Sequence, residues 1–315
     1  MTELECAQWL KTRDRFLILT HVRPDGDTLG SAGGLALALR ELGKTAHVLC
    51  NPGITETYAD YMTGLWAPED FVPEHIVAVD IATENLLPDA ALAYRGKSEI
   101  CIDHHPSNEF YAGETCLDAG AAACGEIIFG LLELLGVSPD ARMAEAIYVA
   151  ISTDTGCFQY SNTTADTLRI AAACKDAGAD TYAVNQIFFG TKSFARLKLE
   201  ARLTGSAEFY AGGKVALVEL PQAWLDELGA SEDDVDSIAG FARAIEGVEL
   251  GITVRDVEDG NGKLSLRTSG TYNACELCRE LGGGGHAAAA GATVPGGIAG
   301  AKRAILDVLR RKGII

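Results

Sequence analysis

Acidic and histidine residues occur at four points in the first half of the chain, each directly after an apolar run. They are residues 21–27 (HVRPDGD), Asp80 after HIVAV, the triplet Asp103-His104-His105, and Asp154. Carboxylates and imidazoles are common ligands of divalent metal ions. If they converge on one edge of a sheet, these groups would suit the hydrolysis of a phosphoester by two metal ions.

The segment 21–27 places three potential ligands on one short loop. Asp25 and Asp27 are two residues apart and can face different ions, while Pro24 restricts the loop and Gly26 lets its backbone come close. The same pattern would also serve as an ordinary helix-capping turn with a surface histidine. This segment by itself leaves both interpretations open.

Asp80 and Asp154 each end a run that is expected to be buried, where an unpaired carboxylate is costly. Neither segment has an adjacent lysine or arginine. A metal ion or another cation must therefore compensate these charges. Four unrelated acidic loop ends would be a coincidence.

Strand and helix patterns alternate through residues 1–190. Short apolar runs predict strands at 16–20, 45–50, 76–80 and 99–103, and helical spacing predicts helices at 28–42, 121–135, 141–151 and 164–178. This order predicts an α/β domain with a mostly parallel, wound sheet. Sites in such sheets form beyond the carboxyl ends of the strands, where the acidic clusters occur.

The second half of the chain has a different pattern. Residues 191–204 predict a helical connector. Residues 205–315 predict a smaller, mixed α/β domain with strands at 214–220, 248–255 and 263–269 and short helices near 232–244 and 273–281. The length of 315 residues agrees with two domains.

Composition restricts the partners. The net charge of −18 disfavours long nucleic acids, so an anionic substrate must be short and held locally. No apolar run reaches about 18 residues, so no membrane span is expected. Nine scattered cysteines predict reduced thiols in the cytoplasm. The single CxxC at 275–278 lacks a second ligand pair and does not predict zinc.

A run of four glycines precedes His286. One glycine would suffice to end a helix, whereas several let backbone amides approach an anion closely. Arg267 is a second candidate for binding a phosphate or a base edge. The alternative is a flexible turn with a solvated arginine.

The motifs HVRPDGD, AVD, DHHP and TDTG resemble, in order and spacing, the four motifs of the DHH-superfamily phosphoesterases. Within the superfamily, the chain is most similar to the NrnA type, bacterial nanoRNases and pAp phosphatases. The resemblance implies two Mn²⁺ ions, with Mg²⁺ or Co²⁺ as alternatives. It assigns His21 and Asp25 to one ion, Asp27, His104 and Asp154 to the other, and Asp80 to both. His105 would face the substrate phosphate, and Asp103 would orient a histidine.

The segment GGGGHAAAAG resembles the signature of the first type of DHH-associated C-terminal domain, which binds the nucleotide end of the substrate. The resemblance implies contacts from Arg267, Ser269, Gly283, Gly284, Gly285 and His286. Thr268 stands where the family usually has serine, and Asn273 where aspartate is common. Both departures concern nucleotide contacts and leave the metal motifs unchanged.

We therefore expect a metal-dependent hydrolase with its active site in a cleft between two domains. The expected substrates are short oligoribonucleotides, linear dinucleotides such as pApA, and 3′-phosphoadenosine-5′-phosphate (pAp). The resemblance also allows a homodimer. Inorganic pyrophosphatase or polyphosphatase activity is one alternative, although the lysine-rich signature of family-II pyrophosphatases is missing. A non-catalytic nucleotide sensor is another.

Overall fold

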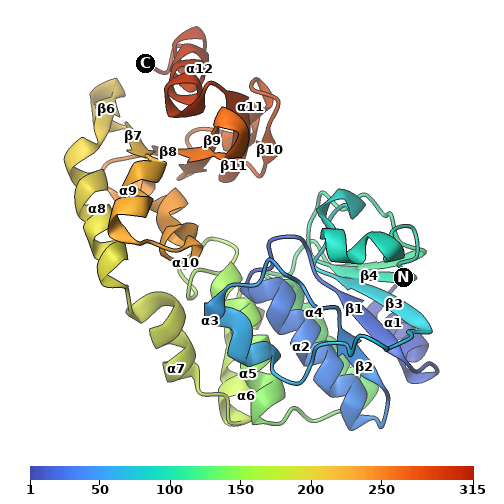
Figure 1. The fold of residues 1–315 in the computed structure, drawn as a ribbon. Helices are drawn as coiled ribbons and strands as arrows, with labels where there is room; N and C mark the ends of the chain where they lie inside the picture. Colours follow the sequence, from blue (N-terminus) through green and yellow to red (C-terminus); the bar gives the residue numbers. More distant parts are fainter. The chain divides into compact units, whose positions relative to one another are not determined.

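The computed structural model describes the backbone of residues 1–315 and all side chains except those of residues 232, 233, 236, 237 and 258. The chain forms two compact units, Met1–Thr191 and Lys192–Ile315, which are coloured blue to green and yellow to red in Figure 1. No helix of the described part of the chain is both long and apolar enough to span a membrane.

Five parallel strands form the sheet of the first unit, in the order β2-β1-β3-β4-β5. Their bounds are β1 Phe16–Leu19, β2 Ala46–Val48, β3 His75–Val79, β4 Ile100–Asp103 and β5 Glu114–Leu117. From β1 the chain continues to β2 on one side and then returns to β3 on the other. The carboxyl ends of β1 and β3 therefore flank the switch point at which open parallel sheets bind ligands. The predicted wound, mostly parallel sheet is confirmed, and β5 is an edge strand that was not predicted.

Both faces of this sheet are buried, which explains why its strands are continuously apolar. On one face, Phe16, Ile18, Val77 and Val79 join the core beneath the helices. These helices are α1 Glu3–Lys11, α2 Gly26–Glu41, α3 Glu56–Ala59, α4 Cys124–Leu135, α5 Ala141–Asp154, α6 Ala165–Asp176 and α7 Thr181–Asn185. The other face is covered by loops and two 3-10 turns, Glu84–Leu86 and Asp89–Tyr94.

The second unit is built on a six-stranded sheet, in the order β10-β11-β9-β8-β7-β6. All neighbours are antiparallel except β7 and β8. The strands are β6 Glu208–Tyr210, β7 Val215–Leu220, β8 Leu250–Val257, β9 Asn261–Thr268, β10 Gly284–Gly285 and β11 Ala289–Pro295. The predicted mixed α/β architecture is thus present.

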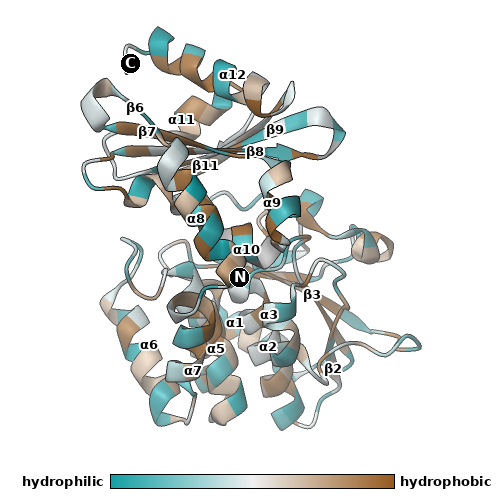
Figure 2. Cartoon of the chain, turned by 60° about the vertical axis from the view of Figure 1, so that its left-hand side comes forward, coloured by the Kyte–Doolittle hydropathy of each residue, from teal (hydrophilic) through white to brown (hydrophobic). Residues whose placement is uncertain are grey.

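Helices lie on both faces of this second sheet (Figure 2). On one face are α11 Ala274–Arg279 and α12 Gly297–Arg311; on the other are α8 Phe194–Ser206, α9 Gln222–Leu228 and α10 Glu232–Val235. The segment expected to be a connector, α8, buries Leu199 and Leu203 against this sheet.

Two details differ from the sequence analysis. The single helix expected at 232–244 is α10 followed by two 3-10 turns, Asp236–Gly240 and Ala242–Ala244, and a glycine inside this segment disfavours a continuous helix. Helix α12 was not predicted, although its sequence alternates apolar and basic residues with helical spacing.

Candidate active site

The structure brings the six predicted metal ligands together beyond the carboxyl ends of β1, β3 and β4. Three overlapping groups have ligand atoms within 4.8 Å of one another: His21 with Asp25 and Asp80, Asp27 with His104 and Asp154, and Asp80 with His104 and His105. Asp80 belongs to two of these groups. The first two groups are the two ligand sets suggested by the resemblance, and Asp80 lies between them.

The separations in the cluster are those of shared ligands rather than of hydrogen bonds. Nε2 of His21 lies 3.5 Å from Oδ1 of Asp25 and 3.8 Å from Oδ2 of Asp80. Nε2 of His104 lies 3.5 to 3.6 Å from carboxylate oxygens of Asp27, Asp80 and Asp154. Hydrogen bonds are usually about 2.7–3.2 Å long. Two ligands that each lie about 2.1 Å from one cation are roughly 3.0–3.6 Å apart, a range that includes all of these separations except the 3.8 Å between His21 and Asp80.

Asp80 is the least satisfied residue of the cluster. It is only 3% exposed, and its Oδ1 is buried without a hydrogen-bond partner. Its backbone has φ of 59°, a left-handed conformation that is uncommon for residues other than glycine and typical of functional sites. Burial, followed by the charges of Asp27 and Asp25, raises its pKa well above the ordinary value. A cation beside Oδ1 would give this oxygen a partner and would offset the burial and repulsion of the charged carboxylate. The residues present therefore fit a metal ion.

Asp27 is held in place by the first turn of α4. Its Oδ2 accepts a hydrogen bond from the amide of Cys124 at 2.7 Å, and its Oδ1 accepts from the amide of Gly125 at 3.0 Å and from Oγ of Ser31 at 2.9 Å. The start of α4 has no side-chain cap of its own, so this carboxylate satisfies its open amides. One residue thus joins α2 to α4 and orients an oxygen toward His104.

Asp154 is the last residue of α5 and closes the second ligand set. Burial, followed by the charges of Asp27 and Asp25, raises its pKa to about 8. A carboxylate with such a pKa releases its proton readily only when positive charge is brought close. This electrostatic situation again favours a bound cation.

The two histidines of the DHH triplet have different surroundings. Nδ1 of His104 lies 3.2 Å from the carbonyl oxygen of Ala121, and this contact leaves Nε2 to face the carboxylates. Nδ1 of His105 lies 2.7 Å from Oδ1 of Asp103. Asp103 is fully buried, and its Oδ2 accepts a hydrogen bond from Asn108 at 2.6 Å. Asp103 therefore orients His105 and does not point into the ligand cluster.

The predicted nucleotide-binding residues lie in the second unit, around the hairpin of β10 and β11. Arg267 is half-buried on β9 and is paired in register with Ala289, and Ser269 follows that strand. The hairpin turns at His286, whose amide donates to the carbonyl of Ala289 at 2.7 Å. The amide of Ala274, the first residue of α11, donates to the carbonyl of Ala287 at 2.8 Å. The hairpin tip is thus fixed to the start of α11.

The glycine run has several structural roles. Gly282, with φ of 75°, lies in the turn that follows α11, where the amide of Gly283 donates to the carbonyl of Cys278. A Cβ atom on Gly283 would lie 2.2 Å from the carbonyl oxygen of Gly291, and one on Gly285 would lie 2.6 Å from that of Ala289. A Cβ on Gly284 would meet nothing within 4 Å. The positive φ therefore explains Gly282 and packing explains Gly283 and Gly285, whereas neither explains Gly284.

Sequence analysis missed several residues that support the site. Asn108 holds Asp103, Ser31 holds Asp27, and Oγ1 of Thr28 donates to the carbonyl of Val79 at 3.0 Å, which ties α2 to the end of β3. Asn108, three residues after His105, carried a signal in its closeness to DHH. The amides at the start of α4 carried none, since they lie almost 100 residues from Asp27.

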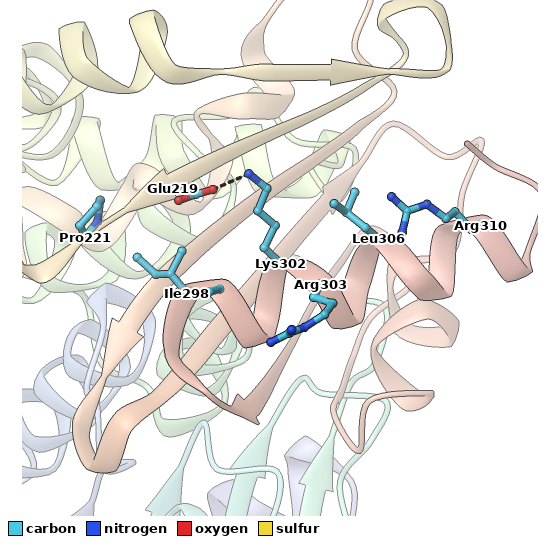
Figure 3. A pocket seen from close by; sticks show the side chains of 8 residues that line it. Glu219, Pro221, Ile298, Lys302, Arg303, Leu306 and Arg310 are labelled. Atoms are coloured by element: carbon cyan, nitrogen blue, oxygen red, sulfur yellow. Dashed lines mark hydrogen bonds and ion pairs between the residues drawn. The ribbon is translucent and has the colours of Figure 1, made fainter.

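A separate pocket of about 630 Å³ lies beside α12 in the second unit (Figure 3). Lys302 crosses it and forms ion pairs with Glu219 and Glu208. None of the predicted site residues lines this pocket. It is therefore distinct from the metal-ligand cluster and from the glycine hairpin.

Comparison with known proteins identifies the family of the chain. Residues 15–151 match the DHH family, N-terminal domain, and residues 212–312 match the DHHA1 domain. The chain is 32% identical over 281 residues to the bifunctional oligoribonuclease and PAP phosphatase NrnA of Thermus thermophilus, covering 89% of this chain and 84% of that protein. The NrnA of Bacillus subtilis is 26% identical over 296 residues, covering 92% of each.

Among solved structures, the fold is similar to that of an exopolyphosphatase-related protein from Bacteroides fragilis. The TM-score is 0.88 at 23% identity, and the match covers 98% of this chain and 96% of that one. This similarity supports the fold alone. Taken with the two domain matches and the NrnA relatives, the conclusion is that the chain belongs to the DHH family, among the members with a DHHA1 domain, and is a hydrolase of phosphoester bonds.

Proposed function

We propose that the protein is an NrnA-type enzyme that hydrolyses short oligoribonucleotides, linear dinucleotides such as pApA, and pAp, using two Mn²⁺ ions. The observation that carries the proposal is Asp80, a buried carboxylate with an unsatisfied oxygen between two ligand sets. The printed activities of the T. thermophilus and B. subtilis relatives support the choice of substrates.

His21, Asp25 and Asp80 would hold one cation, and Asp27, Asp80, His104 and Asp154 the other. Mixed carboxylate and imidazole ligands suit Mn²⁺ and also accommodate Mg²⁺ or Co²⁺. When bound, two such cations supply an acidified water molecule and neutralise the charge that develops on the phosphate. Asp27 is held in place by the amides of α4 and the hydroxyl of Ser31.

His105 would act on the substrate phosphate rather than on a metal. Nδ1 of His105 would donate its proton in a hydrogen bond to Oδ1 of Asp103, so that nitrogen would stay protonated. Nε2 would then be the atom that acts on the substrate. Nε2 would donate to a phosphate oxygen or protonate the leaving group. Asp103 stabilises the charged imidazole and is itself stabilised by Asn108.

The second unit would bind the nucleotide. Arg267 offers a planar pair of donors for a phosphate or a base edge. Ser269, Gly283, Gly284, Gly285 and His286 would add contacts around the hairpin of β10 and β11. Since packing leaves Gly284 unexplained, its bare outer surface fits a close approach by the ligand. The net charge of −18 disfavours long strands and favours substrates of a few nucleotides.

Product analysis tests the proposal. The protein is incubated with Mn²⁺ and a 5′-labelled RNA trimer, pAp or pyrophosphate, each in parallel with a chelator. We expect mononucleotides from the trimer and phosphate from pAp. Cleavage of pyrophosphate alone would move the protein to a pyrophosphatase function, and tight nucleotide binding without turnover would indicate a sensor.

Variants separate the two units. Arg267→Ala should raise KM for nucleotides without changing the content of bound Mn²⁺. Arg303→Ala, which removes an exposed arginine of α12, is the charge-matched control and should change neither quantity. Loss of metal in Arg267→Ala would contradict the division of roles.

A further inference from the structure

The backbone turns sharply immediately after Asp154. Gly156, Cys157 and Phe158 have φ values of 55°, 56° and 64°, so three consecutive residues adopt the left-handed conformation. The turn is closed by hydrogen bonds from the amide of Cys157 to the carbonyl of Ser152, at 2.7 Å, and from the amide of Tyr160 to that of Thr155. Costly backbone of this kind concentrates at functional sites, where it fixes the direction of a side chain.

The side chain that this turn directs is Tyr160, which is 61% exposed. A Cβ atom on Gly156 would lie 2.3, 2.5 and 2.7 Å from Cζ, Cε1 and Cε2 of the Tyr160 ring. Because three ring atoms lie at similar distances, Gly156 faces the plane of the ring and not its edge. The glycine lets the ring lie directly over the backbone, while the tyrosine side chain as a whole stays largely exposed.

The segment that carries Tyr160 is fastened to the candidate metal centre. Nδ2 of Asn162 donates to the carbonyl of Asp154 at 3.1 Å and to that of Ala122 at 3.0 Å. The neighbouring carbonyl of Ala121 lies 3.2 Å from Nδ1 of His104. Asn162 thus ties the turn to one proposed ligand and to the loop that orients another.

We infer that Tyr160 is a stacking platform for a nucleobase of the substrate. An exposed aromatic ring that lies over a glycine, in a segment tied to the candidate metal centre, is suited to recognise a base by its π-surface. Stacking accepts every base, so Tyr160 would contribute affinity for nucleotides without selecting a sequence. The inference rests on the proposed function, because only a nucleotide substrate would use this ring.

Steady-state kinetics with Mn²⁺ tests this role. Wild type, Tyr160→Ala and Tyr160→Phe are compared on pApA and on two analogues in which one or the other nucleotide is abasic. Tyr182→Ala is the matched control, since Tyr182 is also an exposed tyrosine of the first unit, on α7. Thermal unfolding and the content of bound Mn²⁺ are measured for every variant.

We expect Tyr160→Ala to raise KM for pApA roughly 5- to 150-fold, the range for loss of one stacked base, with little change in kcat. Tyr160→Phe keeps the ring and should match wild type, as should Tyr182→Ala. On one of the two abasic analogues, wild type and Tyr160→Ala should have equal KM, which would identify the stacked base.

Two negative results are distinguishable. If wild type cleaves pApA and Tyr160→Ala has the same KM, the stacking role is wrong while the proposed function stands. If wild type cleaves neither pApA nor the RNA trimer, the proposed function fails and the stacking role fails with it.

Discussion

Replacing Asp80 with asparagine should stabilise the metal-free protein and abolish its response to metal. Asparagine has nearly the size of aspartate, and both residues tolerate the left-handed backbone found at this position, where φ is 59°. The substitution therefore removes one buried negative charge and changes little else. Alanine would add backbone strain to the loss of charge and would be harder to interpret.

The magnitude follows from the spacing of the carboxylates. Ligand oxygens of Asp25 and Asp80 lie within 4.8 Å of each other, so the ionised pair would repel by about 3.5 kcal/mol at an effective dielectric constant of about 20. Burial and the neighbouring acids raise the pKa of Asp80, so protonation relieves part of this cost in the metal-free protein. We expect a net gain of about 1–3 kcal/mol, with Tm rising roughly 2–4 °C for each kcal/mol.

Thermal unfolding with a chelator, and then with increasing Mn²⁺, measures both effects. Wild type should gain stability with Mn²⁺ by mass action, whereas Asp80→Asn should start higher, gain little and lose nearly all turnover. Asp89→Asn, which neutralises an exposed acid, is the control and should behave as wild type. A lower Tm for metal-free Asp80→Asn, or an unchanged response to Mn²⁺, would refute the reasoning.

Three further predictions concern Asp154, Asn108 and the glycine run. Because the pKa of Asp154 is raised from 3.8 to about 8, the folded metal-free protein keeps a proton that the unfolded chain has lost. Its stability should therefore fall as pH rises from about 4 to 8, and Asp154→Asn should flatten this profile in urea unfolding with a chelator. Asn108→Ala leaves a buried oxygen of Asp103 without its hydrogen-bond donor. The substitution should lower the free energy of unfolding by about 1–3 kcal/mol and lower kcat about 10-fold or more. An unchanged kcat would exclude a role of Asn108 in orienting His105 through Asp103. Gly283→Ala should lower Tm because the added Cβ would lie 2.2 Å from a carbonyl oxygen. Gly284→Ala should leave Tm unchanged and raise KM for nucleotides. Equal Tm values for the two variants would contradict the close packing of Gly283.

The convergence of the candidate ligands could be predicted from the sequence, because each motif is local and follows its own apolar run. Parallel strands place their carboxyl ends at one edge, so Asp27, Asp80 and His104 could be expected to meet, whereas Asp154 reaches them from the end of a helix, α5. The pairing of β1 with β3 then brings Asp80 between the two ligand sets. No knowledge of side-chain packing was needed for this step.

Other features depend on contacts that leave no local pattern. The amides of α4 that hold Asp27 belong to the backbone, so the residue types of that segment do not indicate the contact. The glycine run was interpreted as a loop for an anion, and β10 with its close contact to β11 became visible only in the structure. The left-handed turn after Asp154 likewise contains two residues, Cys157 and Phe158, whose identities do not suggest it.

The order of the ligands along the chain also has a consequence for biosynthesis. Every proposed metal ligand lies between His21 and Asp154, and the compact unit that contains them ends at Thr191. Domains generally fold as units during translation, beginning with the N-terminal one. The nascent chain can therefore complete the unit with the candidate metal ligands before most of the DHHA1 domain has been synthesised. Metal supply at that stage would influence how fast the nascent unit becomes resistant to proteolysis.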